Sequence, residues 1–190
     1  MNMAAAMRLL NSERVGQWLL NVLEFASLPT FLVSLNQFQS YQTGRWAEPY
    51  YLSTLVAAVV TTFFLLRGVV LNRLAIGINL YLVSGCLAQW FELTSVNQFY
   101  GETRAAGMLM WIMIVGVVAT TISRAGFIGV GLVNVQRRLL LSLALLVGAV
   151  VATGLSYYFI GNRWLSEFVP FVLLFTLQNR LRALAARSLG

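Results

Sequence analysis

The stretch QWLLNVLEFASLPTFLVSL, residues Gln17–Leu35, is apolar enough to cross a lipid bilayer, yet it contains Glu24 near its centre and Pro29 shortly after it. A charged side chain at the centre of a bilayer costs about 2.5–3.5 kcal/mol on insertion scales. A proline inside a helix removes one backbone hydrogen bond and clashes with the carbonyl four residues earlier, here that of Phe25. If this stretch is a membrane span, the presence of Glu24 and Pro29 in it requires a structural or functional explanation.

The composition of the whole chain places it in a membrane. Of the 190 residues, 59% are hydrophobic and only 10% are charged, and the mean hydropathy is +0.77. Soluble domains carry about 25% charged residues, so this chain lacks the residues for a water-facing surface. Because the apolar character runs from Trp18 to Leu181, we expect no cleaved leader and a single helical transmembrane domain over residues 1–190.

The lengths of the apolar segments predict how many helices cross the membrane. A bilayer core of roughly 30 Å requires about 20 apolar residues per helix. Six segments approach this length, so we predict an all-α polytopic membrane protein with six transmembrane helices. The predicted spans are about 16–37, 50–66, 74–91, 105–123, 139–160 and 164–179. Turn-forming residues in TSVNQFYGETR, residues 94–104, predict a loop between the third and fourth spans.

The arginines predict the orientation of these spans, because cytoplasmic loops are enriched in Lys and Arg. With the N-terminus inside, ten arginines fall in cytoplasmic segments and three fall outside. The three outer ones are Arg45, Arg104 and Arg163. We therefore predict that the N- and C-termini are both cytoplasmic and that the protein lies in a bacterial cytoplasmic (inner) membrane.

The net positive charge of the protein indicates which anionic partners to expect. It is +7, and all thirteen cationic side chains are arginine. In a membrane protein such an excess belongs to cytoplasmic loops, so we expect no nucleic-acid partner. The end segments MNMAAAMRLLNSERV (1–15) and NRLRALAARSLG (179–190) are either interfacial helices or solvated tails. Their arginines are expected to pair with anionic lipid headgroups.

Missing residue types exclude most intramembrane chemistry. The chain has no His, Lys or Asp, and its single cysteine is Cys86. Zinc and haem sites built on His, triads that contain His, Lys Schiff bases and cysteine clusters are therefore excluded. We expect no metal, no organic cofactor and no enzymatic activity.

Three glycines in RAGFIGVGLVNVQRR, residues 124–138, superficially match a nucleotide-binding loop. That fingerprint requires a preceding strand and an acidic residue about twenty positions later. The sequence predicts no strand before these glycines, and it has no acidic residue at that distance after them. Three alternatives stay open for this segment: a cytoplasmic interfacial loop, a bent continuation of the fourth span, or a short re-entrant segment.

Small residues recur at every fourth position of the fifth span, a spacing that lets another helix approach closely. They are Ala144, Gly148, Ala152 and Ser156. Gly116 and Thr120 have the same spacing in the fourth span. Either the two spans pack on each other within one chain, or this face forms a homo-oligomer.

The polar residues of the first span share one helical face. Glu24, Ser27 and Ser34 lie on it with Phe31, and Asn21 precedes Glu24 by about one turn. Such a face is expected to point into the bundle, because desolvation disfavours a charged carboxylate. We expect Glu24 to be protonated or solvated by water, with hydrogen bonds to Asn, Ser or Thr side chains. A proline-interrupted span is also a pointer to a transport site.

The polar face of the first span would border a cavity inside the bundle, and further residues are candidates for binding a ligand or proton in this cavity or at its outer mouth. Asn79 lies within the third span, and the others fall near predicted outer ends of helices. These are Gln89, Trp90, Glu92, Tyr157, Trp164 and Glu167. Aromatic rings beside amides and carboxylates can hold a small polar or cationic solute, but Trp and Tyr at these depths also serve as interface anchors.

Two functions from different classes follow from these features. The leading hypothesis is a transporter, channel or substrate-binding membrane component for a small polar or cationic solute, with proton coupling through Glu24 as one form of it. The alternative is a non-catalytic structural or assembly subunit of a larger membrane complex. The first function requires the carboxylic acid of Glu24, whereas the second requires the helix faces that mediate assembly.

Overall fold

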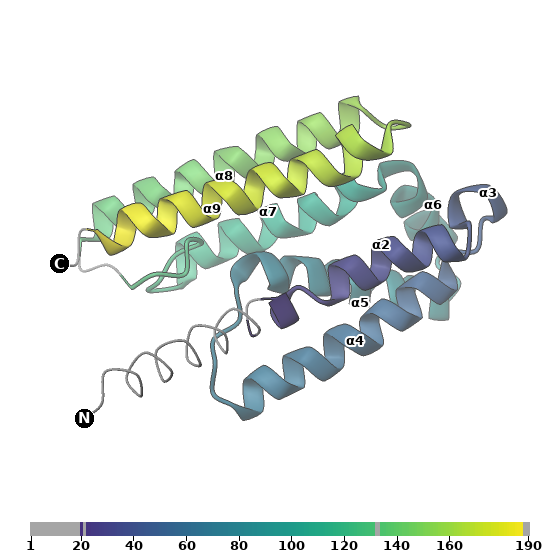
Figure 1. The fold of residues 1–190 in the computed structure, drawn as a ribbon, viewed down its shortest axis with the longest axis horizontal. Coiled ribbons are helices and arrows are strands. Elements are labelled where there is room, and N and C mark those ends of the chain that lie inside the picture. Colours follow the sequence, from purple (N-terminus) through teal and green to yellow (C-terminus); the bar gives the residue numbers. More distant parts are fainter. Residues whose placement is uncertain (1–19, 21, 132–133, 188–190) are drawn as a thin grey trace, which may run out of the picture. The chain divides into compact units, whose positions relative to one another are not determined.

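The computed structural model describes residue 20 and residues 22–131 and 134–187. Over these residues the structure is all-helical and has no strand, as predicted. Backbone contacts divide the chain into two compact units, Met1–Leu71 and Asn72–Gly190. Figure 1 shows the helices that build each unit. That residues 1–190 form a single transmembrane domain stays a prediction.

The first unit contains α2 (Ser27–Gln37), the short α3 (Ser40–Thr43) and α4 (Ala47–Leu66). α2 and α4 pack against each other, with α3 in the connection between them. The rings of Phe31 on α2 and Tyr50 on α4 lie with their centroids 5.1 Å apart, and both side chains are buried. An aromatic contact of this kind stabilises a helix pair beyond the area that it buries.

The second unit is built from four long helices that alternate in direction (Figure 1). They are α5 (Arg73–Trp90), α7 (Ala105–Ile122), α8 (Val135–Tyr158) and α9 (Val169–Ala186). The helix α6 (Thr94–Thr103) joins α5 to α7, and a π-helical turn, η1 (Trp164–Phe168), leads into α9. α7 packs against both α5 and α8, and α8 packs against α9. Helices that follow each other in the chain are therefore neighbours in space, as short connections require.

Three of the described helices, α4, α7 and α8, are long and apolar enough to cross a membrane. Their exposed surfaces are also unusually apolar. On α8, Leu140 and Val147 are 67% and 62% exposed, whereas the hydroxyl residues Ser142 and Ser156 are buried. Large apolar side chains on the outside, with hydroxyl residues buried among apolar ones, are what contact with lipid favours, so these helices indicate a membrane-embedded protein.

The helices occupy the predicted spans with some differences at their ends. α4, α5 and α7 match the second, third and fourth spans closely, and α8 begins earlier than predicted, at Val135. η1 and the first part of α9 occupy the sixth span, and α9 continues to Ala186. The first span is described only from residue 20 onward, without residue 21, and the proposed interfacial segment 1–15 lies outside the described residues.

Residues 94–104 were expected to form a loop, and this expectation is wrong because most of them form α6. The helix is held by the phenol of Tyr100, which accepts a hydrogen bond from Trp111 Nε1 at 2.8 Å. The same hydroxyl lies 2.7 Å from Ser84 Oγ. These contacts tie α6 to both α5 and α7, and such tertiary contacts outweigh the weak helix propensities of Thr, Asn and Gly.

The segment between α7 and α8 is a loop over its described residues 123–131 and 134, so the alternative of a bent helix is wrong. Phe127 and Ile128 in this loop are both fully buried. Phe127 N donates to Ser142 Oγ at 3.1 Å, and Arg182 Nε donates to the carbonyl of Ile128 at 3.0 Å. The loop is therefore bonded to both α8 and α9 rather than lying loosely on the surface.

Gly77 marks a close approach of α5 to α7 and provides a test of this packing. A Cβ atom there would lie 2.7 Å from Ile112 Cα and 3.0 Å from Ile112 N, and backbone atoms cannot move aside easily. Gly77→Ala is therefore expected to lower the free energy of unfolding in detergent by about 1–3 kcal/mol, measured by thermal or denaturant unfolding followed by circular dichroism.

Gly154→Ala on α8 is the matched control, because a Cβ at Gly154 would meet nothing within 4 Å. This variant is expected to be as stable as the wild type or slightly more stable. Equal stability of Gly77→Ala and Gly154→Ala would contradict the close contact between α5 and α7.

Candidate functional site

The helix that carries Glu24 is interrupted directly after this residue. Residues 25 and 26 form a turn, and α2 begins at Ser27. At the interruption the backbone hydrogen bonds span three residues rather than four, as in the 3.2 Å bond from Phe25 N to Val22 O. Such a tightened stretch within a helix often marks a hinge or a functional position.

Pro29 explains why the helix is interrupted here. It has no N–H to donate to the carbonyl of Phe25, and that oxygen instead accepts a hydrogen bond from Leu28 N at 3.0 Å. The next carbonyl, that of Ala26, accepts from both the N–H and the hydroxyl of Thr30, at 3.2 and 2.7 Å. Pro29 thus falls in the first turn of α2, where a missing N–H is tolerated.

The polar face predicted for the first span is buried where the structure describes it. Glu24 is 7% exposed, Ser27 and Ser34 are each 2% exposed, and Phe31 is 4% exposed. The hydroxyl of Ser34 donates to the carbonyl of Phe31 at 2.9 Å. Asn21, the remaining candidate on this face, lies outside the described residues. That the face binds a solute or a proton stays a prediction.

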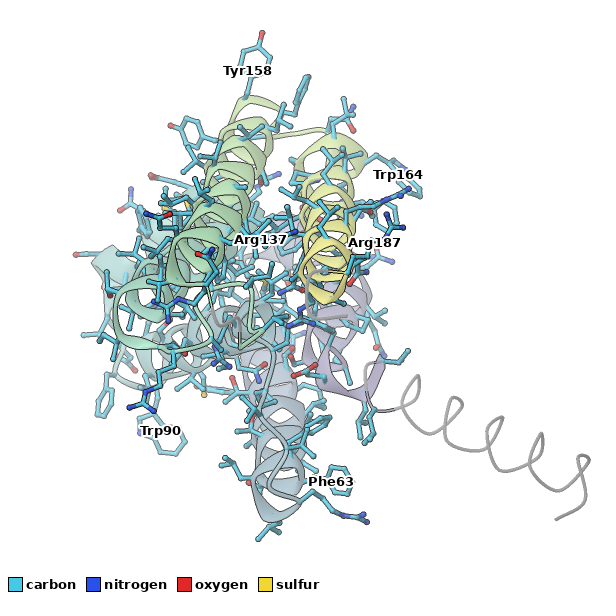
Figure 2. All side chains as sticks on the ribbon, turned by 90° about the vertical axis from the view of Figure 1, so that its left-hand side faces the viewer. Phe63, Trp90, Arg137, Tyr158, Trp164 and Arg187 are labelled. Atoms are coloured by element: carbon cyan, nitrogen blue, oxygen red, sulfur yellow. The ribbon has the colours of Figure 1, made fainter. Side chains whose placement is uncertain are left out.

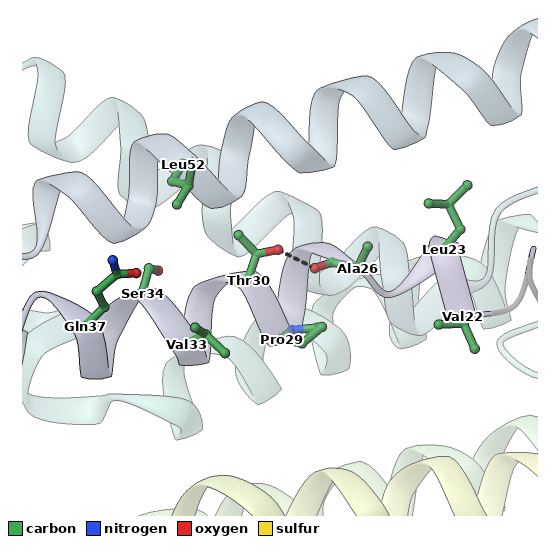
Figure 3. A pocket seen from close by; sticks show the side chains of 9 residues that line it. All are labelled: Val22, Leu23, Ala26, Pro29, Thr30, Val33, Ser34, Gln37 and Leu52. Carbon is green, nitrogen blue, oxygen red and sulfur yellow. Dashed lines mark hydrogen bonds between the residues drawn. The ribbon is translucent and has the colours of Figure 1, made fainter.

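A groove of about 610 Å³ runs along α2 beside the interruption (Figure 3). It is lined by Val22, Leu23, Ala26, Pro29, Thr30, Val33, Ser34, Gln37 and Leu52. The lining is mainly apolar, with polar groups from Thr30, Ser34 and Gln37. The volume is within the range of small-molecule sites. Glu24 is not among the lining residues.

The aromatic residues predicted at an outer mouth are largely exposed. Trp90, Tyr157 and Trp164 are 72%, 62% and 71% exposed, and Figure 2 shows Trp90 and Trp164 pointing away from the helices that carry them. Of the other candidates, Glu92 is exposed, whereas Gln89 and Asn79 are half-buried on α5. Exposed Trp and Tyr rings near helix ends have the placement of interface anchors.

Glu167 differs from these aromatic residues because it is buried, with only 9% of its surface exposed. It lies in η1, whose position is set partly by a 2.7 Å hydrogen bond from Ser156 Oγ to the carbonyl of Ser166. π-Helical turns are rare and frequently occur at functional positions. The two candidate carboxylates, Glu24 and Glu167, are therefore each associated with an irregular turn of a helix.

The small-residue row of α8 is used mainly in contacts within the chain. Ala152 and Ser156 are buried, Gly148 is half-buried and Ala144 is exposed. A Cβ at Gly148 would collide with the side chain of Leu177 on α9. The contact between α7 and α8 involves Gly116, where a Cβ would lie 3.0 Å from Leu146 Cδ1. Gly148 thus serves the pairing of α8 with α9, a pairing that the sequence did not single out.

A buried pair of amides was missed by the sequence analysis. Asn72 Nδ2 donates to Gln178 Oε1 at 3.0 Å, and Gln178 Nε2 donates to Asn72 Oδ1 at 2.8 Å. Asn72 Oδ1 also accepts from Leu74 N at 3.1 Å and so caps α5. An Asn directly before an apolar helix is a recognisable capping signal, but nothing in the sequence indicates that its partner lies 106 residues away.

The comparisons with known proteins do not assign this chain to a family. No protein-family model matches it, and the curated proteins and the solved structures likewise yield no match. The fold defines only a class, namely an all-helical protein whose three apolar helices indicate that it is embedded in a membrane.

The amide pair can be tested with two neighbouring substitutions on α9. Gln178→Leu removes both side-chain hydrogen bonds between Asn72 and Gln178, so we expect the free energy of unfolding in detergent to fall by about 0.5–2 kcal/mol. Asn179→Leu is the control, because Asn179 is adjacent in sequence and exposed. Equal effects of the two variants on the unfolding midpoint would show that the amide pair contributes nothing specific.

Proposed function

We propose that the protein is a small transporter, or the membrane-embedded solute-binding component of one, for a small polar or cationic solute. The observation that carries this proposal is the interruption of the helix at residues 25 and 26, directly after the buried carboxylic acid of Glu24. Carboxylic acids inside membranes and interrupted helices are both features of solute and ion pathways.

The proposed role of Glu24 follows from its burial. A charged carboxylate in a poorly solvated position is unfavourable unless a cation neutralises it. In this proposal Glu24 carries either a proton or a bound cationic group, so the site is close to neutral in both states. Exchange of one for the other would couple solute movement to proton movement. The turn beside it allows the local backbone to change conformation with less loss of helical hydrogen bonding than a regular helix requires.

The proposal includes six spans with both termini in the cytoplasm of a bacterial cell. It is supported by the charge distribution along the second unit. Arg73, Arg124, Arg137 and Arg182 all lie near one set of helix ends, whereas Glu92, Glu102 and Glu167 lie near the opposite ends. This asymmetry is the one that the positive-inside rule associates with orientation in the membrane.

A role as an assembly subunit of a larger membrane complex is the second candidate. It is favoured by the character of the groove on α2, because the exposed side chains of Val22 and Val33 border it and are 52% and 64% exposed. An apolar groove on a membrane protein suits the side chains of a neighbouring helix as well as a solute. This alternative requires no chemistry of Glu24.

The role of Glu24 is tested by Glu24→Gln, with Glu48→Gln as the matched control in the same unit. Glu48 is paired with Arg45, whose Nε donates to Glu48 Oε1 at 2.9 Å. We expect at least one member of a panel of monovalent cations and small amines to raise the melting temperature of the wild type and of Glu48→Gln but not of Glu24→Gln. Infrared difference spectra should show a carboxyl band that this compound shifts and that Glu24→Gln lacks.

If every compound affects Glu24→Gln and Glu48→Gln alike, the carboxylic acid of Glu24 has no binding role and the subunit function is favoured.

Pro29→Ala tests whether the interruption itself is needed. Alanine restores an N–H that can donate to the carbonyl of Phe25, so we expect a continuous helix and slower hydrogen exchange of amides 25–30. The free energy of unfolding should rise by about 1 kcal/mol for the added hydrogen bond, while the cation response of Glu24 weakens. An undiminished cation response together with slower exchange would show that the interruption has no part in binding.

A further inference from the structure

One end of the second unit is rich in arginine. Five of these residues form what we call the arginine end: Arg124 after α7, Arg137 and Arg138 in the first turn of α8, and Arg180 and Arg187 in and after the last turns of α9. All are exposed except Arg138, which is half-buried. The three glutamates of the same unit lie at the opposite helix ends, namely Glu92 after α5, Glu102 in α6 and Glu167 in η1.

Contacts between segments bring these arginines together. Arg138 Nη1 donates to the carbonyl of Arg124 at 2.9 Å, which joins α8 to the preceding loop. Arg137 Nη2 lies 3.4 Å from the carbonyl oxygen of Leu184, which brings α8 next to the last turn of α9. Figure 2 looks onto this end and shows Arg137 on α8 and Arg187 after α9. The positive charge is therefore concentrated in one place.

No acidic residue compensates this charge within the part of the chain that the structure describes. None of the five arginines of the arginine end forms an ion pair with a described residue. The hydrogen bonds of Arg137 and Arg138 go to neutral carbonyl oxygens. Arg138 Nε is buried and has no hydrogen-bond partner. A buried donor without an acceptor is unfavourable, and the positive charge of Arg138 also has no described anion beside it.

The position of Arg137 and Arg138 on their helix adds to this electrostatic imbalance. The N-terminus of a helix carries a partial positive charge and favours acidic residues. The first turn of α8 contains no acidic residue and places two arginines there instead. An anion near this turn would interact favourably with both the arginines and the helix end.

The adjoining surface indicates which anion is suitable. Directly after Arg138, the side chains of Leu140 and Leu143 are 67% and 49% exposed, so the apolar exterior of α8 begins within one turn of the arginines. In a bilayer this boundary is the level of the lipid headgroups. The planar guanidinium group matches a phosphate group with two parallel hydrogen bonds.

We propose that the arginine end binds the phosphate of an anionic phospholipid headgroup, with Arg124 and Arg137 as its exposed ligands and Arg138 held beside them. The proposal is independent of the solute site, because none of these residues belongs to the segment around Glu24. The sequence predicted that arginines of the end segments pair with lipid headgroups. The proposed site lies elsewhere, where the loop before α8 meets the first turn of that helix.

Native mass spectrometry of the purified full-length protein tests this proposal by comparing binding of phosphatidylglycerol with binding of phosphatidylcholine. We expect phosphatidylglycerol to bind more tightly, and its affinity to fall as the salt concentration rises. Arg124→Gln and Arg137→Gln should each weaken binding of phosphatidylglycerol about fivefold, the effect of one arginine near an anionic surface. Binding of phosphatidylcholine should not change. Arg137→Lys keeps the charge but not the planar guanidinium group, so its affinity for phosphatidylglycerol should lie between those of Arg137→Gln and the wild type.

Arg163→Gln is the charge-matched control, because Arg163 is exposed and precedes η1 at the other end of the unit. An equal loss of affinity in this variant would show a general charge effect and would overturn the proposal, as would equal affinity of the wild type for the two lipids. Displacement of phosphatidylglycerol by inorganic phosphate would show a site for a free anion and would also overturn it. Should a variant fail to fold, the lipid preference and salt dependence of the wild type still decide the question.

Discussion

A polar group inside an apolar helix bundle cannot obtain its hydrogen bond from water, and this constraint accounts for the hydrogen bonds of many buried side chains in the protein. The buried hydroxyls of Ser53, Thr120 and Thr153 each donate to the carbonyl four residues earlier on their own helix, at 2.5, 2.7 and 2.8 Å. The amides of Asn72 and Gln178, which cannot be satisfied in this way, bond to each other. Because these hydroxyls and amides find partners within the protein, the outer surfaces of the long helices can remain apolar.

In the irregular segments, backbone N–H and carbonyl groups also find partners within the protein, but outside the regular helical pattern. In the loop after α7, the N–H of Phe127 is bonded to Ser142 and the carbonyl of Ile128 to Arg182. In η1, the carbonyl of Ser166 is bonded to Ser156. At residues 25 and 26, bonds that span three residues replace the regular helical pattern. Irregular segments with these bonds can persist within a membrane protein, and two of the three carry a buried glutamate in or directly before the turn.

The positions of the long helices were predictable because they depend on local composition. A run of apolar residues of sufficient length specifies a helix with little reference to its neighbours, which is why α4, α5, α7 and α8 fall close to their predicted spans. Pro29 likewise indicated an interruption close to its own position, since its missing N–H acts within one turn. α6 was not predictable in the same way, because its formation depends on the bonds of Tyr100 to two other helices.

The sequence by itself determined the membrane class, the all-helical fold, the burial expected for Glu24 and the concentration of arginine at alternate helix ends, since each follows from composition, spacing or charge along the chain. Only the tertiary structure decided which polar groups become partners. The pairing of Asn72 with Gln178, the contact of Gly148 with Leu177 on α9 and the meeting of Arg137 with the last turn of α9 join segments far apart in the sequence. A hydrogen bond or close contact depends on distances of a few ångströms between helices, and no local pattern in the sequence specifies those distances.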